Sequence, residues 1–326
     1  MILVGGIDEA GLGPLLGPLC MGACGLLVPT VERADARLWD VLAEAVSRDV
    51  KRDKERLVVD DSKRVYSRND RGRRRLETTV LCFARAGGGA VSAIEDLALG
   101  GDDEARWLAR YPWRDGAPIA APTWISPDFV ELRAAPLERA LEQHDVRIAL
   151  LGVRSVEPGE LNAAMDASGN KSRAAWEFAA HDLRLLLERA IAAGAERADI
   201  TIDRQGGRAH YGPQLARALP VGFTVHLVEE TEGVSRYRLT GPIEARITIA
   251  EKAELGSFTT ALASCAAKYV RERSMQALND WFAERIDGLA PTAGYTTDGR
   301  RWLNDVATRA PGVLAELDRD LVVRRR

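Results

Sequence analysis

The sequence is poor in cysteine and has no long apolar run. Its four cysteines stand among apolar neighbours and lack the paired spacing of a zinc site, so we expect buried, reduced thiols without a chemical role. They are Cys20, Cys24, Cys82 and Cys265. Without a long apolar run, no membrane span is predicted. Met1 leads directly into the apolar residues 2–4 without a basic leader, so we expect no signal peptide and a cytoplasmic protein.

The chain also lacks a strong charge bias. Its 45 basic and 48 acidic residues give a formal net charge of −3, which argues against a protein that coats nucleic acid by overall charge. Basic residues nevertheless gather at 51–56, 68–75 and 324–326. Such runs can contact phosphates, but each alone is more typical of a solvated helix face or a tail. The four histidines are scattered; His210 follows Asp203 closely, but a surface or structural role is commoner for such a residue.

What the sequence does contain is a repeated alternation of strand and helix patterns. Its composition, 46% hydrophobic and 29% charged, is that of an ordinary globular protein. Helical patterns begin near Leu76, Ser172 and Ser257. Predicted strands cover 2–7, 19–28, 146–153, 200–203, 223–228 and 247–250. The alternation favours an α/β fold with a mixed central sheet flanked by helices.

A long irregular segment interrupts this alternation. Residues 87–136 contain glycines, prolines, an acidic patch and three tryptophans without clean periodicity, so we predict an insertion there. Tryptophans in such a segment more often close a small satellite core than bind a ligand. A length of 326 residues allows a core with an insertion. We therefore predict a main domain over 1–286 and a small C-terminal helical extension over 287–326.

Acidic residues lie at the ends of two predicted strands and before a predicted helix. Asp8 and Glu9 follow the first strand, Asp203 ends a later one, and Glu254 precedes the helix near Ser257. Ligands of an open α/β sheet bind outside its strand ends, so these acids can converge although they are distant in sequence. Carboxylate oxygens are the ligands that Mg²⁺ and Mn²⁺ prefer. The pattern thus indicates a metal site.

Two other interpretations of the opening segment stay open at this point. A solvated acidic turn is the commoner role of a lone acidic pair. A glycine-rich phosphate loop fits less well, because Pro14 lacks an amide donor and the acids at 8 and 9 repel a phosphate unless cations lie between them. The turn through Gly11 and Gly13 can end the strand and let both acids reach one site.

Four segments together resemble the ribonuclease H type 2 family, which contains ribonucleases HII and HIII. The opening GIDEAGLGPLLGP at 6–18 is similar to the family's acidic glycine-rich signature, and DSKR at 61–64 to its second element. The segment KAELGSFTTALASCAAKYVRER at 252–273 is the strongest later match. AGYTT at 293–297 is similar to a short element near the family's C-terminal end.

The resemblance implies a ribonuclease H-like fold whose 1–286 domain is catalytic. It places Asp8, Glu9, Asp203 and Glu254 at four metal-ligand positions for two Mg²⁺ or Mn²⁺ ions. The activity implied is hydrolysis of the RNA strand of RNA–DNA hybrids, or cleavage at ribonucleotides embedded in duplex DNA. The substrate-binding positions implied are Gly11, Leu12, Gly13, Lys63 and Tyr295. Protein partners are not predicted.

Some residues depart from the pattern of ribonuclease HII. Leu12 stands where those enzymes carry arginine between two glycines, and leucine cannot supply a guanidinium to grip the nucleotide at an RNA-to-DNA junction. Glu254 and the Asn170–Lys171 pair are more similar to ribonuclease HIII. The alternative is therefore a relative with altered catalysis that binds nucleic acid or a protein partner. A small-molecule hydrolase is disfavoured by the 252–273 segment.

Overall fold

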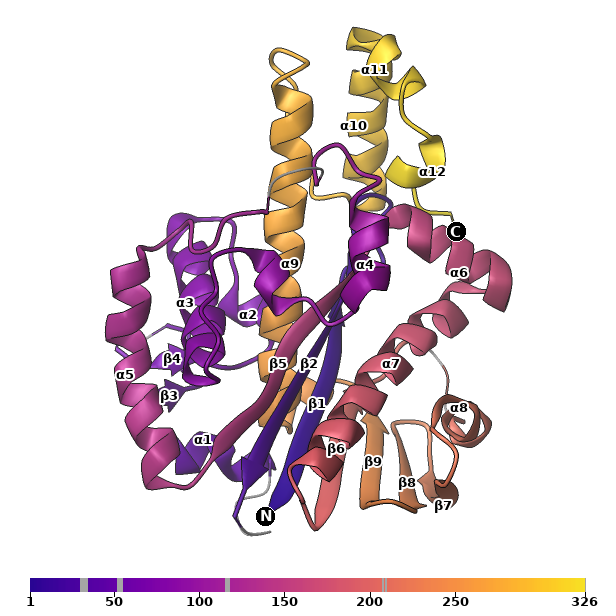
Figure 1. Cartoon of the computed structure of the whole chain (residues 1–326). Coiled ribbons are helices and arrows are strands. Elements are labelled where there is room, and N and C mark those ends of the chain that lie inside the picture. Colours follow the sequence, from indigo (N-terminus) through magenta and orange to yellow (C-terminus); the bar gives the residue numbers. More distant parts are fainter. Residues whose placement is uncertain (30–34, 52–54, 115–117, 207, 209, 326) are drawn as a thin grey trace.

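The computed structural model describes residues 1–29, 35–51, 55–114, 118–206, 208 and 210–325. Within these residues, seven strands form one mixed sheet in the order β5-β2-β1-β6-β9-β8-β7 (Figure 1). The strands are β1 (Ile2–Ala10), β2 (Leu19–Val28), β5 (Arg147–Val156), β6 (Arg197–Asp203), β7 (Thr224–Glu230), β8 (Val234–Thr240) and β9 (Glu244–Ala250). The neighbours β1, β6 and β9 are parallel, and the other pairs are antiparallel. A separate parallel pair is formed by β3 (Val46–Ser47) and β4 (Leu57–Val58).

Helices flank the sheet, and the long ones begin at side-chain caps. Ser257 accepts a hydrogen bond from the amide of Thr260 at the start of α9, and Asn170 accepts one from Arg173 at the start of α7. None of the described helices is long and apolar enough to cross a membrane. The helices are α1 (Leu38–Val41), α2 (Ser62–Val65), α3 (Asp70–Ala86), α4 (Gly101–Leu108), α5 (Pro127–Gln143), α6 (Pro158–Ser168), α7 (Lys171–Ala192), α8 (Gly212–Ala218), α9 (Phe258–Ala283), α10 (Thr296–Arg309), α11 (Pro311–Ala315) and α12 (Arg319–Val322). Three-residue and four-residue 3-10 turns are η2 (Asp35–Arg37), η3 (Ile94–Leu97) and η4 (Ala253–Leu255).

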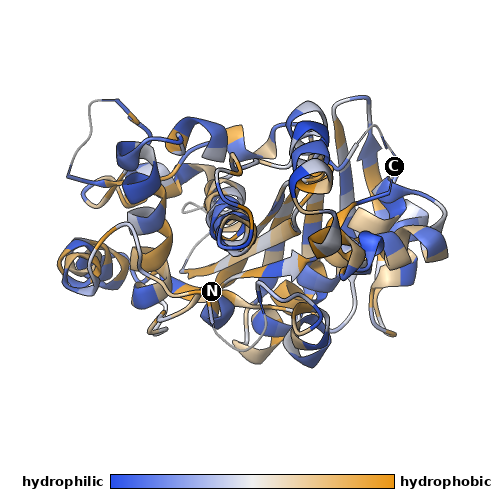
Figure 2. Cartoon of the chain, turned by 90° about the horizontal axis from the view of Figure 1, so that it is seen from above, coloured by the Kyte–Doolittle hydropathy of each residue, from blue (hydrophilic) through white to orange (hydrophobic). Residues whose placement is uncertain are grey.

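Alternate residues of β1 fill the two faces of the sheet. Val4 packs in a cluster with α3, α5 and α9, whereas Leu3 packs in a second cluster with α7. α9 lies close to β1 because Gly6 has no side chain: a Cβ there would lie 2.1 Å from the amide nitrogen of Thr260. Seen from above, strands rich in hydrophobic residues run between the helices (Figure 2). The expected α/β fold with a mixed sheet flanked by helices is confirmed.

Two expected details can be checked directly. All four cysteines are buried and free, as predicted. The expected end of the first strand at Asp8 is wrong, because β1 continues to Ala10, which still pairs with Cys20 of β2. β8 was not predicted, since it alternates buried Tyr237 and Leu239 with exposed arginines and contains the polar Ser235.

The predicted insertion contains more regular structure than its composition indicated. Its last residues belong to α5, which starts after the cap Ser126 and runs past the predicted boundary at 136. Trp113 is buried against Phe282 of α9, with ring centroids 5.9 Å apart, as expected for a satellite core. Residues 115–117 lie outside the described part. The division of the chain into a domain, an insertion and an extension stays a prediction.

The C-terminal piece packs firmly on the upper part of α9 (Figure 1). A third hydrophobic cluster joins Trp302 of α10 and Val322 of α12 to Leu16, which follows β1. Leu16 and Val323 also form an isolated antiparallel bridge. The C-terminal helices therefore lie against the loop that follows the first strand.

Candidate metal centre

Three carboxylates meet at the ends of two neighbouring parallel strands. Asp8 and Glu9 lie near the end of β1, and Asp203 ends β6. One oxygen from each of the three lies within 4.8 Å of the other two. The pairing of β1 with β6 ends at Ile7 and Ile202, so Asp8 lies level with Asp203 and Glu9 lies one residue past the end of β6. The end of β6 lets two successive residues of β1 reach one site, although their side chains start on opposite faces.

The three acids are held close together and largely out of water. Burial, followed by the charges of Glu9 and Asp203, raises the pKa of Asp8 well above its usual value. Burial and the charge of Asp203 raise the pKa of Glu9 to about 8, and burial raises the pKa of Asp203 to about 6. The Oε2 atom of Glu9 is buried without a hydrogen-bond partner among the described residues. Repelling carboxylates with an unused oxygen are a donor set that fits a divalent cation.

Glu254 and Lys63 border this group. Glu254 lies in η4 after β9 and is 9% exposed; it is not one of the three mutually close acids, but its charge adds to the rise in the pKa of Glu9 and Asp203. The amide of Ala253 donates to Asp203 Oδ1 at 2.9 Å, which ties η4 to the group. Lys63 is exposed, and its positive charge opposes the same two pKa rises.

A serine of α9 to which sequence reasoning gave no role also contacts the group. A hydrogen bond from Ser264 partly offsets the rise in the pKa of Asp8. The hydroxyl of Ser264 also lies 2.9 Å from that of Ser62, at the start of α2. The signal in the sequence that could have identified Ser264 is its position in the 252–273 segment, ten residues after Glu254. It links the acids to the segment that carries Lys63.

The acidic pair before α2 has structural roles. Asp61 caps α2 by accepting a hydrogen bond from the amide of Lys63 at 2.9 Å. Asp60 is fully buried and pairs with Arg48 at 3.2 Å and Arg64 at 2.7 Å. These contacts fix the backbone from which Lys63 extends.

The glycine-rich loop after β1 has one crowded and one open glycine. Gly11 has a φ of +90°, and a Cβ there would lie 2.1 Å from Nε of Arg271. Gly13 is exposed, and a Cβ there would meet nothing within 4 Å. Leu12, between them, is partly buried and packs against the hydrophobic cluster of α7. Of the three, Gly13 is thus the position most open to solvent.

The short C-terminal element lies against this loop. The amides of Leu15 and Leu16 donate to the carbonyl of Gly294 at 2.7 and 3.1 Å. Tyr295 follows directly and is 53% exposed. The structure therefore brings the candidate substrate-binding segments 11–13 and 294–295 to neighbouring loops.

Beneath the loop lies buried charge that was not predicted. Arg324, expected in a solvated basic tail or on phosphate, is only 2% exposed; Arg326 lies outside the described residues. The guanidinium of Arg324 donates to the carbonyls of Gly17, at 2.7 Å, and Gly11. The expectation for Arg324 is therefore wrong. A basic residue in a short run at the chain end carries no pattern that signals burial.

Three further residues complete what we call the buried arginine cluster. Glu157 is 1% exposed, and the charges of Arg114, Arg324 and Arg271 oppose the rise in its pKa that burial causes. Arg271 of α9 also donates to the carbonyl of Ala293 at 3.3 Å. The cluster consists of Arg114, Glu157, Arg271 and Arg324.

The scattered polar residues take ordinary roles. His210 is exposed and pairs with Glu230 at 2.5 Å, which is a surface role. Lys268 of α9 pairs with Glu272 at 2.6 Å on the same helix.

Comparison with known proteins gives likenesses of structure. No family model and no curated protein matches the chain. The chain is similar to ribonuclease HII in the PCNA:RNase HII complex from Archaeoglobus fulgidus, with 16% identity over 99% of this chain and 94% of that chain and a TM-score of 0.45. It is similar to ribonuclease H2 from Pyrococcus horikoshii OT3, with 15% identity over 98% and 92% and a TM-score of 0.45. It is also similar to Bst-RNase HIII in complex with Mn²⁺, with 14% identity over 99% and 66% and a TM-score of 0.43. At these identities and TM-scores, the likenesses carry no argument about function.

Proposed function

We propose that this protein is a metal-dependent endonuclease of the ribonuclease H type. Its substrate in this proposal is the RNA strand of an RNA–DNA hybrid, or a ribonucleotide embedded in duplex DNA. The observation that carries the proposal is the convergence of Asp8, Glu9 and Asp203 within 4.8 Å, with Glu254 beside them. These are the positions that the motif resemblance assigns to metal ligands.

The four carboxylates are the residues that would hold two Mg²⁺ or Mn²⁺ ions. When bound, such ions supply activation of water and neutralisation of the charge on the scissile phosphate. The chain's own contribution is to hold the acids in place: Ala253 donates to Asp203, and the amide of Glu9 donates to Asp8 Oδ1 at 2.7 Å. No histidine is needed as a base in this scheme, which agrees with the surface position of His210.

Substrate binding is assigned to the loops beside the acids. The exposed ammonium of Lys63 is suited to a backbone phosphate next to the scissile bond. The exposed ring of Tyr295 is suited to stacking on a sugar or base, and the backbone of Gly11 and Gly13 to close approach by the ribose. Leu12 packs inward and offers no hydrogen bond, so we expect weak recognition of a single ribonucleotide.

Cleavage of three duplexes tests the proposal. The purified protein is incubated with Mg²⁺ or Mn²⁺ and a duplex with one ribonucleotide, an RNA tract joined to DNA, or a full hybrid. We expect cleavage of the hybrid and little cleavage at the single ribonucleotide. Asp8→Asn should lower the cleavage rate by more than roughly 100-fold. Loss of a residue that only hydrogen-bonds a metal ligand costs up to about 100-fold, and Asp8 is proposed to be a ligand itself.

A matched control separates loss of the site from loss of a charge. Glu244→Gln removes an exposed carboxylate at the opposite end of β9, so we expect its rate to equal that of the wild type. Absence of cleavage of every duplex, or equal rates for Asp8→Asn and wild type, overturns the proposal. Binding of the hybrid without cleavage would instead favour the alternative of a catalytically altered binding protein.

A further inference from the structure

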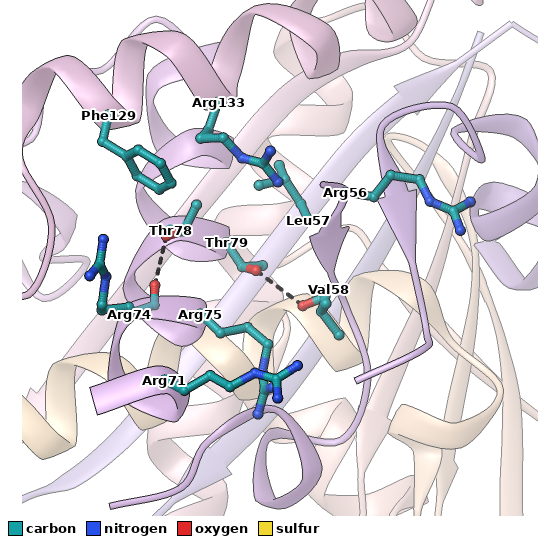
Figure 3. A pocket seen from close by; sticks show the side chains of 10 residues that line it. All are labelled: Arg56, Leu57, Val58, Arg71, Arg74, Arg75, Thr78, Thr79, Phe129 and Arg133. Carbon is teal, nitrogen blue, oxygen red and sulfur yellow. Dashed lines mark hydrogen bonds between the residues drawn. The ribbon is translucent and has the colours of Figure 1, made fainter. Parts of the chain in front are cut away.

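The protein has an arginine-lined pocket that the proposed cleavage does not use. The pocket lies between β4, the start of α3 and α5, and its volume is about 190 Å³ (Figure 3). Half of its ten lining residues are arginines, and none is acidic. The arginines are Arg56, Arg71, Arg74, Arg75 and Arg133. They come from the basic clusters at 51–56 and 68–75, of which residues 52–54 lie outside the described part, and from α5.

Three of these arginines have no acidic partner among the residues that the structure describes. In the described part of the chain, no carboxylate pairs with Arg71, Arg74 or Arg133. Two acids of α5, Glu131 and Glu138, pair instead with Arg85, at 2.8 and 3.5 Å. The pocket is therefore a local excess of positive charge in a protein whose net charge is −3.

One of the arginines also lies at the unfavourable end of a helix. α3 begins at Asp70, so Arg71 lies in its first turn, where the helix dipole is positive and repels a cation. Burial, followed by the charge of Arg71, lowers the pKa of Arg75. An anion in the pocket would relieve both the repulsion between Arg71 and Arg75 and the repulsion of Arg71 by the helix.

The arginines of the pocket are not all oriented alike, because Arg56 and Arg74 point away from the guanidinium groups of Arg71 and Arg75 (Figure 3). Arg75 is held by the carbonyls of Val65 and Val50, at 2.8 and 3.0 Å. The guanidinium of Arg71 lies beside that of Arg75, and Arg133 reaches from α5 toward Leu57 (Figure 3). Because Nε, Nη1 and Nη2 of Arg75 already donate to backbone carbonyls, Arg75 contributes mainly positive charge, and Arg71 and Arg133 are the candidates for direct contact with an anion.

We propose that this pocket binds a phosphate group. Guanidinium groups match the geometry of phosphate oxygens with paired hydrogen bonds, and several of them around one cavity favour a multiply charged anion. The phosphate could belong to a polynucleotide backbone or to a small phosphorylated molecule. This inference does not rest on the proposed cleavage, because the pocket contains none of the four acids.

Binding without divalent metal tests the proposal apart from catalysis. The full chain is titrated in EDTA against a short fluorescent all-DNA duplex at several salt concentrations. Arg71→Gln combined with Arg133→Gln should weaken binding roughly tenfold and reduce the salt slope by about 0.9 for each phosphate that the variant no longer neutralises. Arg139→Gln is the matched control, since Arg139 is an exposed residue of the same helix that does not line the pocket.

Inorganic pyrophosphate identifies the source of the phosphate. We expect it to raise the melting temperature of the wild type and of Arg139→Gln, but not that of the double variant. If only this shift depends on the arginines and duplex binding does not, the pocket binds a small phosphorylated molecule. The proposal is overturned if the double variant and Arg139→Gln bind the duplex equally and pyrophosphate shifts both to the same extent.

Discussion

The metal centre and the buried arginine cluster are both built from charged side chains held away from water. The metal centre includes two acids of β1, and the arginine cluster contacts the loop that follows β1. In the metal centre, Asp8, Glu9 and Asp203 repel one another, and the charge of Lys63 opposes this only in part. In the arginine cluster, the charge of Glu157 is surrounded by three arginines, and Arg324 and Arg271 donate to backbone carbonyls.

This difference distinguishes a ligand-binding site, the metal centre, from a structural element, the arginine cluster. Arg271 and Arg324 of the arginine cluster donate to backbone carbonyls of the loop and of Ala293 beside it, so we interpret the cluster as a brace that holds the loop of Gly11. The acids lack an equivalent supply of donors, and a cation from solution is the partner that lowers their mutual repulsion. Burial of charge alone therefore does not identify a functional site; the sign of the neighbouring charges does.

Removal of Arg324 should have the largest effect on stability. Arg324→Ala leaves the carbonyls of Gly11 and Gly17 without their buried donor and removes one of the three arginine charges around Glu157, so we expect the free energy of unfolding to fall by about 3–5 kcal/mol. Arg325→Ala removes exposed ion pairs with Asp166 and Asp320 and should cost less than about 1 kcal/mol. Urea denaturation measures both. Similar losses for the two variants would show that the arginine cluster is not a brace.

Divalent cations should stabilise the metal centre and leave the arginine cluster unaffected. At a concentration 100 times the Kd, we expect Mg²⁺ or Mn²⁺ to increase the free energy of unfolding by about 2.7 kcal/mol per site. Asp203→Asn should lose this increase, because it removes one of the three converging carboxylates. Arg325→Ala should keep it. Thermal unfolding with and without the cation measures the change, and an equal increase for Asp203→Asn argues against the site.

A methyl group placed between the two regions should disturb only the arginine cluster. In Gly11→Ala, the new Cβ clashes with Arg271 and the positive φ is strained, so we expect a loss of roughly 2 kcal/mol. Gly13→Ala meets no atom within 4 Å and should change stability by less than about 0.5 kcal/mol. Denaturation in EDTA compares the two variants. A larger loss for Gly13→Ala would contradict the described loop.

The pH dependence of stability should distinguish the acids from the rest of the chain. The pKa of Glu9 in the folded protein is about 8 and that of Asp203 about 6, both above the values near 4 of unfolded chains. The folded protein therefore holds more protons, and the associated stability is complete below pH ~4 and is lost as the pH rises through each folded pKa. In EDTA, we expect the free energy of unfolding to fall between pH 6 and 8, by at most about 1.4 kcal/mol per pH unit for each titrating group.

Glu9→Gln isolates this contribution from that of other buried acids. Burial also raises the pKa of Glu104 and Glu160 to about 7, so these groups titrate in the same range in every variant. The slope of the Glu9→Gln variant should be smaller than that of the wild type, and saturating Mg²⁺ should reduce the difference. Identical slopes for the two proteins in EDTA would contradict the raised pKa of Glu9.

The sequence predicted the parts of this protein that repeat with a clear period. The apolar run of β2 was predicted over its observed bounds, Leu19–Val28, and the start of α9 was signalled by its cap, Ser257. β8 was missed because Arg236 and Arg238 are exposed and one of its buried residues, Ser235, is polar. α5 was missed because Pro136 lies inside it and the glycine-rich residues before it carry no period.

The sequence predicted which acids form the metal centre, but not how the strands place them. Asp8, Glu9 and Asp203 stood at expected strand ends, and the parallel pairing of β1 with β6 brings them together. Periodicity cannot reveal that β1 extends past β6, since this depends on where a neighbouring strand ends. The burial of Arg324 was equally invisible, because its acceptors lie in a loop at the other end of the sequence.

The contact between Arg324 and the carbonyl of Gly17 joins residues 307 positions apart. During synthesis the loop after β1 leaves the ribosome 307 residues before the side chain that braces it. Contacts of such sequence separation form late, because a long loop must close first. A nascent chain can thus assemble its central sheet while the segment at 11–17 still lacks its brace. We therefore expect the loop to reach its final geometry only after residue 324 has been released.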